Sequence, residues 1–222
     1  MNSKKAISSF ILGLFLLPLC YGIAKSFLNL VFIINLFSST KELWTFFILG
    51  FISYIIAHFL FSKPLKIYIF GHELTHALSG IISGSSIKSF KLKKDSGSVT
   101  LSKVNLFIAL SPYFIPIYTV ILIIVNIIFK IPKQVFLFLT GASVAFHIAL
   151  TLFAIKQGQS DLKKYGVFYS LVLVFIANCV VLGGILAIFF PVSFADFIID
   201  SIKNTKNGVI FIWTYLTKIF LK

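Results

Sequence analysis

Long apolar stretches separated by short lysine-containing loops dominate the chain. The clearest stretches cover residues 43–62, 106–129, 134–155 and 166–190, and a longer one covers residues 6–37. A helix of about 20 apolar residues crosses the roughly 30 Å hydrocarbon core of a membrane. Only helices or closed barrels satisfy the backbone hydrogen bonds there. We therefore predict an all-α polytopic membrane bundle of about six spans, formed by residues 1–222 as a single domain.

The composition supports a membrane location and argues against nucleic-acid binding. Hydrophobic residues make up 59% of the chain and charged residues only 12%, unlike a soluble domain. The net charge of +14 comes from lysines, and the chain has no arginine, the residue that usually binds phosphate bidentately. Lysine-rich loops stay on the cytoplasmic side of a membrane, beside anionic lipids. We expect a multi-pass protein of a cell membrane, such as the bacterial cytoplasmic membrane, that contacts the lipid bilayer and no nucleic acid.

A further apolar segment, residues 66–84, carries an H-E-x-x-H motif made by His72, Glu73 and His76. Residues four apart lie on one face of a helix, so the two histidines offer imidazole nitrogens to one metal ion. Glu73 lies beside that face, where a carboxylate can act as a general base. Each ionisable group at mid-membrane costs roughly 2.5–3.5 kcal/mol on insertion scales, and such groups mark functional sites. Hydrogen-bonded histidines and a neutral core glutamate would need three separate compensations, whereas one zinc ion would suffice.

The segment 85–104 differs from the apolar runs around it, because apolar residues and lysines alternate along it. The alternating residues are Phe90, Lys91, Leu92 and Lys93 before a polar turn, with Val99 and Leu101 after it. This pattern predicts a small β-hairpin with one apolar and one basic face. Its basic side is either a solvated loop or a strand edge that pairs with an extended peptide.

Breaks in the apolar pattern divide the remaining segments. The run 6–37 is an N-terminal anchor that forms either one long tilted helix or two short ones. Pro112 and Pro116 predict a kink near the start of their span. Near the C-terminus we predict two short pieces broken around residues 204–208. The second piece, residues 209–222, is predicted to be an interfacial amphipathic helix.

A catalytic zinc ion usually has three protein ligands and one water, so the motif needs a third ligand. The lysine distribution places loops 85–104 and 156–165 on one side of the membrane, near the C-terminal end of the motif helix. Asp161, in the second loop, matches that side and depth, but it also fits a helix N-cap. His147 also fits a role in packing, in holding a ligand in place or in contacting substrate. A continuous helix would separate the two by about 21 Å, so both reach one ion only if it breaks, for example at Gly158.

These segments resemble the site-2 protease family of intramembrane zinc metalloproteases. The resemblance covers roughly residues 66–190: the motif His72-Glu73-Leu74-Thr75-His76 in an apolar helix, a hairpin, two spans and an aspartate at the start of another. It implies His72, His76 and Asp161 as zinc ligands and Glu73 as the catalytic base. Asn178 resembles the polar residue that helps to hold the substrate in that family.

The setting of the aspartate departs from the family pattern. Many members have Asn-Pro…Leu-Asp-Gly, whereas this chain has Gln159-Ser160-Asp161-Leu162. The resemblance implies a zinc endopeptidase that carries out regulated intramembrane proteolysis of membrane-spanning or membrane-associated proteins. The alternative is a non-catalytic metal-binding membrane protein, either a degenerate relative that binds a partner or a metal carrier.

Overall fold

The apolar segments of the sequence form long α-helices. The computed structural model describes residues 3–36, 41–93 and 96–220. Within these residues, four helices are long and apolar enough to cross a membrane: α2 (Leu17–Leu36), α3 (Lys41–Leu60), α7 (Lys133–Lys156) and α9 (Val167–Phe189). A fifth span results if a bent pair of helices is counted as one. The helical membrane architecture is therefore confirmed, whereas the predicted six spans are not.

The chain divides into two compact units. One consists of residues 1–41 and 164–222, and the other consists of residues 42–163. The first unit contains α1 (Ser3–Phe15), α2, α9 and α10 (Phe194–Phe220). The N-terminal run forms two helices, α1 and α2, with the break at Leu16, which decides between the two predicted possibilities. Residue 37, the last of that run, lies outside the described residues.

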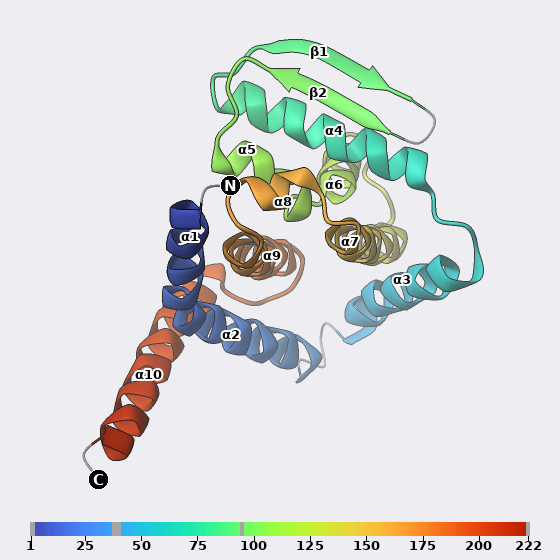
Figure 1. Ribbon diagram of the computed structural model, residues 1–222. Helices are drawn as coiled ribbons and strands as arrows, with labels where there is room; N and C mark the ends of the chain where they lie inside the picture. Colours follow the sequence, from blue (N-terminus) through green and yellow to red (C-terminus); the bar gives the residue numbers. More distant parts are fainter. Residues whose placement is uncertain (1–2, 37–40, 94–95, 221–222) are drawn as a thin grey trace. The chain divides into compact units, whose positions relative to one another are not determined.

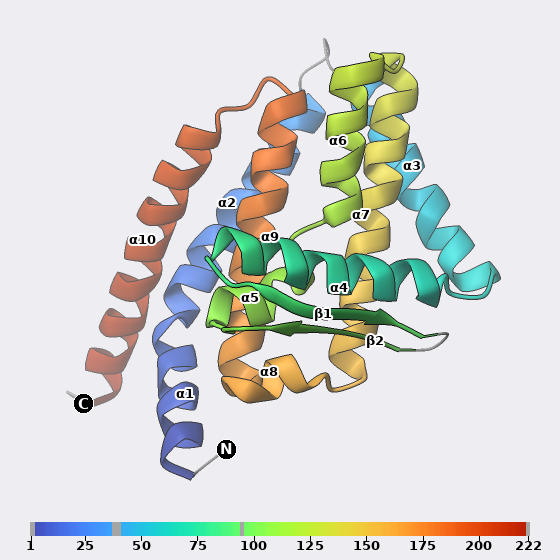
Figure 2. The ribbon, with the colours of Figure 1, turned by 90° about the horizontal axis from the view of Figure 1, so that it is seen from above.

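Helix α10 corrects the prediction of a break around residues 204–208, because it runs without interruption through them. It lies alongside α2 (Figure 2). Asn204 Nδ2 donates a hydrogen bond to Ser26 Oγ at 2.9 Å. Gly208 lets the helix approach Tyr21, whose ring would lie 3.1 Å from a Cβ added there. These contacts with α2 outweigh the turn propensity of asparagine and glycine. Residues 221 and 222 of the predicted interfacial helix lie outside the described residues.

In the second unit, the predicted hairpin lies along α4 (Leu65–Ile82), the helix that carries the motif (Figure 1). The strands are β1 (Ile87–Leu92) and β2 (Gly97–Leu101), paired antiparallel, and residues 94–95 of the turn are not among those described. The apolar side of the hairpin faces α4, where Phe90 packs edge-on against Phe70 with 6.4 Å between ring centroids. The hairpin prediction is thus confirmed.

A glycine follows the end of helix α4, just after its C-cap residue Ser83. Gly84 has φ +72°, a left-handed conformation that costs other residues strain. Its N–H donates to the carbonyl of Ile81, and the next N–H, from Ser85, donates to Gly80. This pattern satisfies the last carbonyls of a helix and turns the chain into the hairpin.

Helix α4 runs across the direction of α6 (Ile117–Phe129) and α7 rather than beside them (Figure 2). It is not among the four helices that qualify as spans.

The predicted proline kink is also present. Helix α5 (Leu106–Leu110) and the 3₁₀ turn η2 (Ser111–Tyr113) meet α6 at 77°. Pro112 lies within η2 and Pro116 immediately precedes α6, at positions where a missing N–H is tolerated. The kink lets α5 lie beside α4 while α6 continues along α7.

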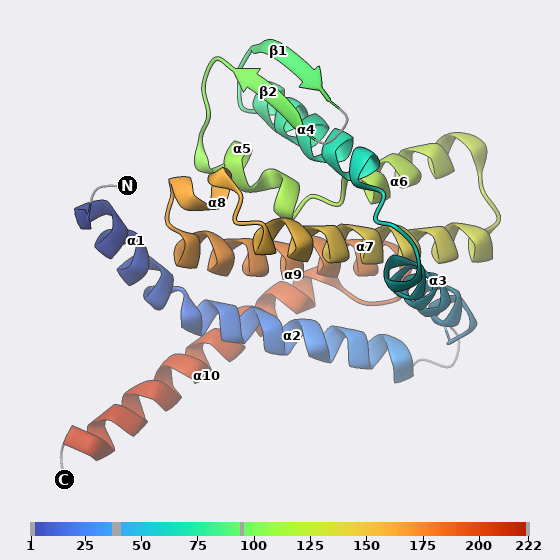
Figure 3. The same ribbon diagram turned by 45° about the vertical axis from the view of Figure 1, so that its right-hand side comes forward.

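A helix break at Gly158, the condition named above for His147 and Asp161 to reach one ion, redirects the chain after α7. Helix α7 ends at Lys156, and Gly158 has φ +67° with its N–H donating to the carbonyl of Ile155. The short helix α8 (Ser160–Lys164) follows and folds back over the end of α7, on the side where α4 and α5 lie (Figure 3). This return brings Asp161 to the motif helix.

Candidate metal centre

Three side chains from α4 and α8 converge on one point. His72 and His76 lie one turn apart on α4, and Asp161 lies in the first turn of α8. Asp161 Oδ2 is 3.7 Å from His72 Nε2 and 3.4 Å from His76 Nε2. Within the described part of the chain, this is the one group of three or more possible protein ligands that lie within 4.8 Å of one another. Of the two candidates for a third ligand, the fold thus brings Asp161 to the motif.

The donor set suits zinc. Zinc takes imidazole nitrogen and carboxylate oxygen at roughly 2.0–2.1 Å in tetrahedral geometry, which separates neighbouring ligand atoms by about 3.4 Å. The observed separations of 3.4 Å and 3.7 Å between Asp161 and the histidines are close to that value. A small adjustment of side chains would therefore complete three protein positions of a catalytic-type site.

Hydrogen bonds on the far side of each imidazole fix how the rings point. The Nδ1–H of His76 donates to the carbonyl oxygen of Ile108 at 2.8 Å, and the Nδ1 of His72 lies 3.2 Å from the hydroxyl of Tyr68. Ile108 is held in turn because Asn105 caps α5, with its Oδ1 accepting the Ile108 N–H at 2.8 Å. Both Nε2 atoms are left to face Asp161. Metal-binding histidines are usually oriented in this way.

Asp161 is prepared to act as a carboxylate. Burial alone would raise the pKa of its carboxyl group, but hydrogen bonding and electrostatic attraction from His72 and His76 lower that pKa below its ordinary value. The hydroxyl of Tyr113 donates a long hydrogen bond of 3.5 Å to Oδ2. The Tyr113 ring also packs edge-on against His72, with 5.4 Å between centroids. Tyr113 therefore supports two of the three converging side chains.

Glu73 lies in the wall of a cavity of about 400 Å³ beside the three converging side chains. The cavity lies between α4, the start of β2 and the start of α8, and its lining residues are Tyr68, Ile69, His72, Glu73, His76, Ser96, Gly97, Ser98, Val99, Gln159, Ser160 and Asp161. Glu73 is 9% exposed. A Cβ added to Gly97 would lie 2.6 Å from Glu73 Cγ, so the absence of a side chain there lets β2 press against the glutamate.

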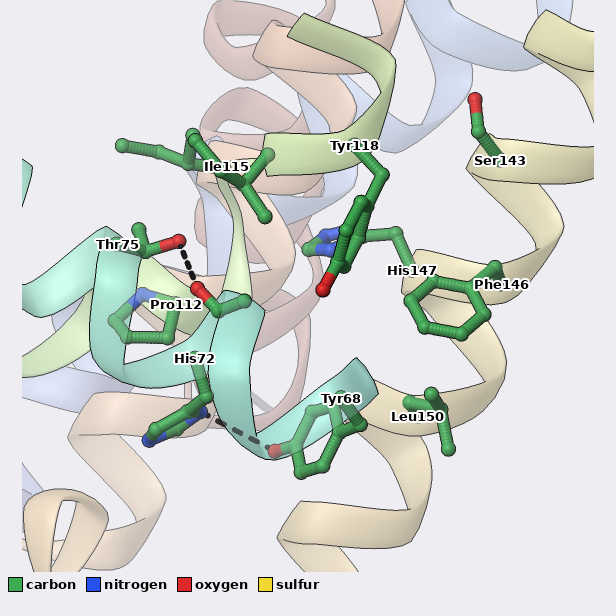
Figure 4. Close-up of a pocket in the computed structure, with 12 residues that line it drawn as sticks. Tyr68, His72, Thr75, Pro112, Ile115, Tyr118, Ser143, Phe146, His147 and Leu150 are labelled. Atoms are coloured by element: carbon green, nitrogen blue, oxygen red, sulfur yellow. Dashed lines mark hydrogen bonds between the residues drawn. The ribbon is translucent and has the colours of Figure 1, made fainter. Parts of the chain in front are cut away.

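His147 is not among the three converging side chains. It is buried on α7 and lines a second, small cavity of about 20 Å³ together with His72, Tyr118 and Ser143 (Figure 4). A space of that size holds roughly one water molecule. Asn178 belongs to the other compact unit, where its Nδ2 donates to the carbonyl of Val174 at 2.8 Å. The substrate-binding roles of both residues stay predictions.

Three residues of the site were not anticipated from the sequence. Tyr68 precedes His72 by four positions, so the helical spacing that pairs the histidines also places it on their face. Gly97 and Tyr113 had no such local signal, because each meets the site through packing between distant segments.

Comparison with protein-family models, curated proteins and solved structures finds no match to this chain.

Proposed function

We propose that this protein is a membrane-embedded zinc endopeptidase that hydrolyses peptide bonds of membrane-spanning or membrane-associated proteins. The observation that carries the proposal is the meeting of His72, His76 and Asp161 at one wall of a cavity that also contains Glu73. Two imidazoles and a carboxylate are a ligand set found in hydrolytic zinc sites, with one position left for water. The resemblance to site-2 proteases points the same way.

Each side chain has a role that follows from its position. When bound, zinc supplies Lewis acidity that polarises a peptide carbonyl and acidifies water. His72, His76 and Asp161 would hold the ion, and Tyr68 and Tyr113 would keep these ligands oriented. The Glu73 carboxylate takes a proton from the attacking water and returns it to the leaving amine. Burial of Glu73 against β2 keeps it from rotating away from the cavity.

The free edge of β2 supports a peptide as the substrate. The N–H of Lys93 donates to the carbonyl of Ser96, which makes these two a hydrogen-bonded pair. Such pairs alternate along antiparallel strands with pairs whose backbone groups point outward. Gly97 and Val99 belong to pairs of this second kind, so their backbone N–H and C=O groups point away from β1. Both residues line the cavity. An extended peptide paired with this edge would lie beside Glu73. A transmembrane helix would first have to unwind, because its carbonyls are hydrogen-bonded within the helix.

The test compares Glu73→Gln with Glu42→Gln, the matched change at the only other glutamate, which is exposed on α3. Membranes of cells that express each protein are searched by mass spectrometry for new peptide termini, and zinc is measured in the purified proteins. We expect wild type and Glu42→Gln to produce the same termini, and Glu73→Gln to lose them while keeping its zinc. Zinc in all three proteins with identical termini would contradict the peptidase and favour a non-catalytic metal-binding protein.

A further inference from the structure

The side of the β-hairpin that faces away from α4 is strongly basic. Side chains alternate across a strand. Because Gly97 and Leu101 face α4, so does Val99, and the alternate residues Ser98 and Thr100 face away from the helix. This outer side, here called the basic face, consists of Ser89, Lys91, Lys93, Ser98 and Thr100. Lys88 and Lys103 are exposed beside it. None of these four lysines takes part in an ion pair among the described residues.

The basic face lies toward one end of a candidate span. Helix α7 has 24 residues, about 36 Å at 1.5 Å per residue, so its ends reach the two surfaces of a bilayer. The hairpin lies toward the end of α7 that leads into α8 (Figures 2 and 3). Lys156 marks that end. With α7 across the membrane, the hairpin therefore lies at the depth of the lipid headgroups.

Exposed apolar residues border the hairpin where α4 ends and α5 begins. Ile82 is 79% exposed and Ile81 is 56% exposed, with Val104 and Phe107 exposed nearby on the chain that enters α5. Apolar side chains beside lysines on one surface are typical of elements that lie in a membrane interface, with the charges among the headgroups.

We propose that the basic face binds the headgroups of anionic phospholipids and lies flat on the lysine-rich side of the membrane. Charge complementarity favours a lipid surface as the partner. The four lysines on and beside the basic face have no ion pair among the described residues. An anionic leaflet carries the opposite charge over a broad, flat area. The hydroxyls of Ser98 and Thr100 on the same face can donate hydrogen bonds to lipid phosphate, whereas the Ser89 hydroxyl donates to Thr100 Oγ1 at 3.0 Å.

A consequence for the substrate follows, and it rests on the proposed peptidase activity. The cavity beside Glu73 is walled by Ser96–Val99 of the same hairpin. With the basic face on the headgroups, this cavity lies at the membrane surface. The substrate class would then be a juxtamembrane segment, already extended, rather than the middle of a transmembrane helix.

The test places a fluorescent label on the basic face of the full-length protein. Thr100→Cys is made in a background with Cys20→Ser and Cys179→Ser, labelled with an environment-sensitive dye and reconstituted into vesicles. Vesicles of phosphatidylcholine alone are compared with vesicles that also contain phosphatidylglycerol. We expect quenching by headgroup-attached spin labels only with phosphatidylglycerol, and a loss of that quenching in high salt.

Two double variants test whether the lysines of the basic face cause the contact with phosphatidylglycerol. Lys91→Gln with Lys93→Gln should lower the equilibrium constant for lipid contact about 25-fold, roughly fivefold for each lysine. The matched control, Lys130→Gln with Lys133→Gln, lies at the opposite end of α7 and should leave the quenching unchanged. Equal quenching in both kinds of vesicle, or equal effects of the two double variants, would overturn the proposal. Stronger protection of the dye by soluble polyglutamate than by phosphatidylglycerol would also overturn it, in favour of an acidic protein partner.

These outcomes are independent of peptide cleavage. Quenching lost with the lysines while Glu73→Gln still abolishes the new termini would support both proposals. If quenching depends on the lysines but no cleavage is detected, the lipid-binding proposal would be supported and the peptidase proposal would be contradicted.

Discussion

Replacing Asp161 with asparagine should remove most of the zinc affinity without unfolding the protein. Asparagine keeps the shape of the side chain and its hydrogen bond from Tyr113, but its neutral amide is a poor zinc ligand. Asp161 is 28% exposed at its side chain, so the substitution leaves no unpaired group deep in the core. The effect should therefore be confined to the metal.

The size of the loss can be worked out from the ligand set. Structural zinc sites with four ligands contribute apparent binding energies of about 10–16 kcal/mol, or about 3 kcal/mol for each ligand. Because 1.4 kcal/mol is a factor of ten in affinity, one lost ligand among three should weaken zinc binding at least about 100-fold. The 3.4 Å and 3.7 Å separations between Asp161 and the two histidines place its charge fully within reach of the ion.

The assay is competition with a chromophoric chelator on protein purified in detergent without chelating agents. About one zinc per chain is expected in the wild type, the stoichiometry of a mononuclear site with three protein ligands. Two controls should keep this affinity: Asp196→Asn on α10 in the other unit, and His147→Ala, because His147 is not among the three converging side chains. Zinc binding by Asp161→Asn within a few-fold of the wild type would refute Asp161 as a ligand, as would loss of zinc from His147→Ala alone.

Three further changes test the parts that support the site. Gly97→Ala would set a Cβ 2.6 Å from Glu73 Cγ, so we expect cleavage to fall about 100-fold through a displaced base while zinc is retained. Gly141→Ala would overlap the backbone of Phe47 where α7 crosses α3, so the melting temperature should fall in proportion to an overpacking cost of about 1–3 kcal/mol. Tyr68→Phe removes the hydroxyl that holds the first motif histidine and should weaken zinc binding about 10-fold.

The glycine predictions share one control. Gly184→Ala on α9 places its Cβ 3.6 Å from the ring of Phe194, an ordinary contact, so it should change neither cleavage nor melting. An equal response from all three glycine variants would mean that the close approaches at Gly97 and Gly141 have no special role. For Tyr68→Phe, an unchanged zinc affinity would remove Tyr68 from the support of the site.

Much of the fold was predictable because the signals are local. Hydropathy located the long helices, alternation located the hairpin, and Pro112 and Pro116 marked the bend before α6. The prediction from local signals was wrong at residues 204–208, where asparagine and glycine favour a turn in isolation. There the contacts of Asn204 with Ser26, more than 170 residues away in the chain, keep α10 continuous.

The sequence by itself determined the spacing of the motif: two histidines and a glutamate about one helical turn apart, in a chain apolar enough for a membrane. Helical periodicity is a property of neighbouring residues, so their spacing is enough to place His72 and His76 together. Only the tertiary structure decided that Asp161, and not His147, meets them. Only the tertiary structure also decided that α4 runs across its neighbours and that β2 presses on Glu73. The placement of Asp161 depends on the turn at Gly158, and the other two arrangements depend on how α4 packs against the hairpin and its neighbouring helices. No local pattern specifies such packing.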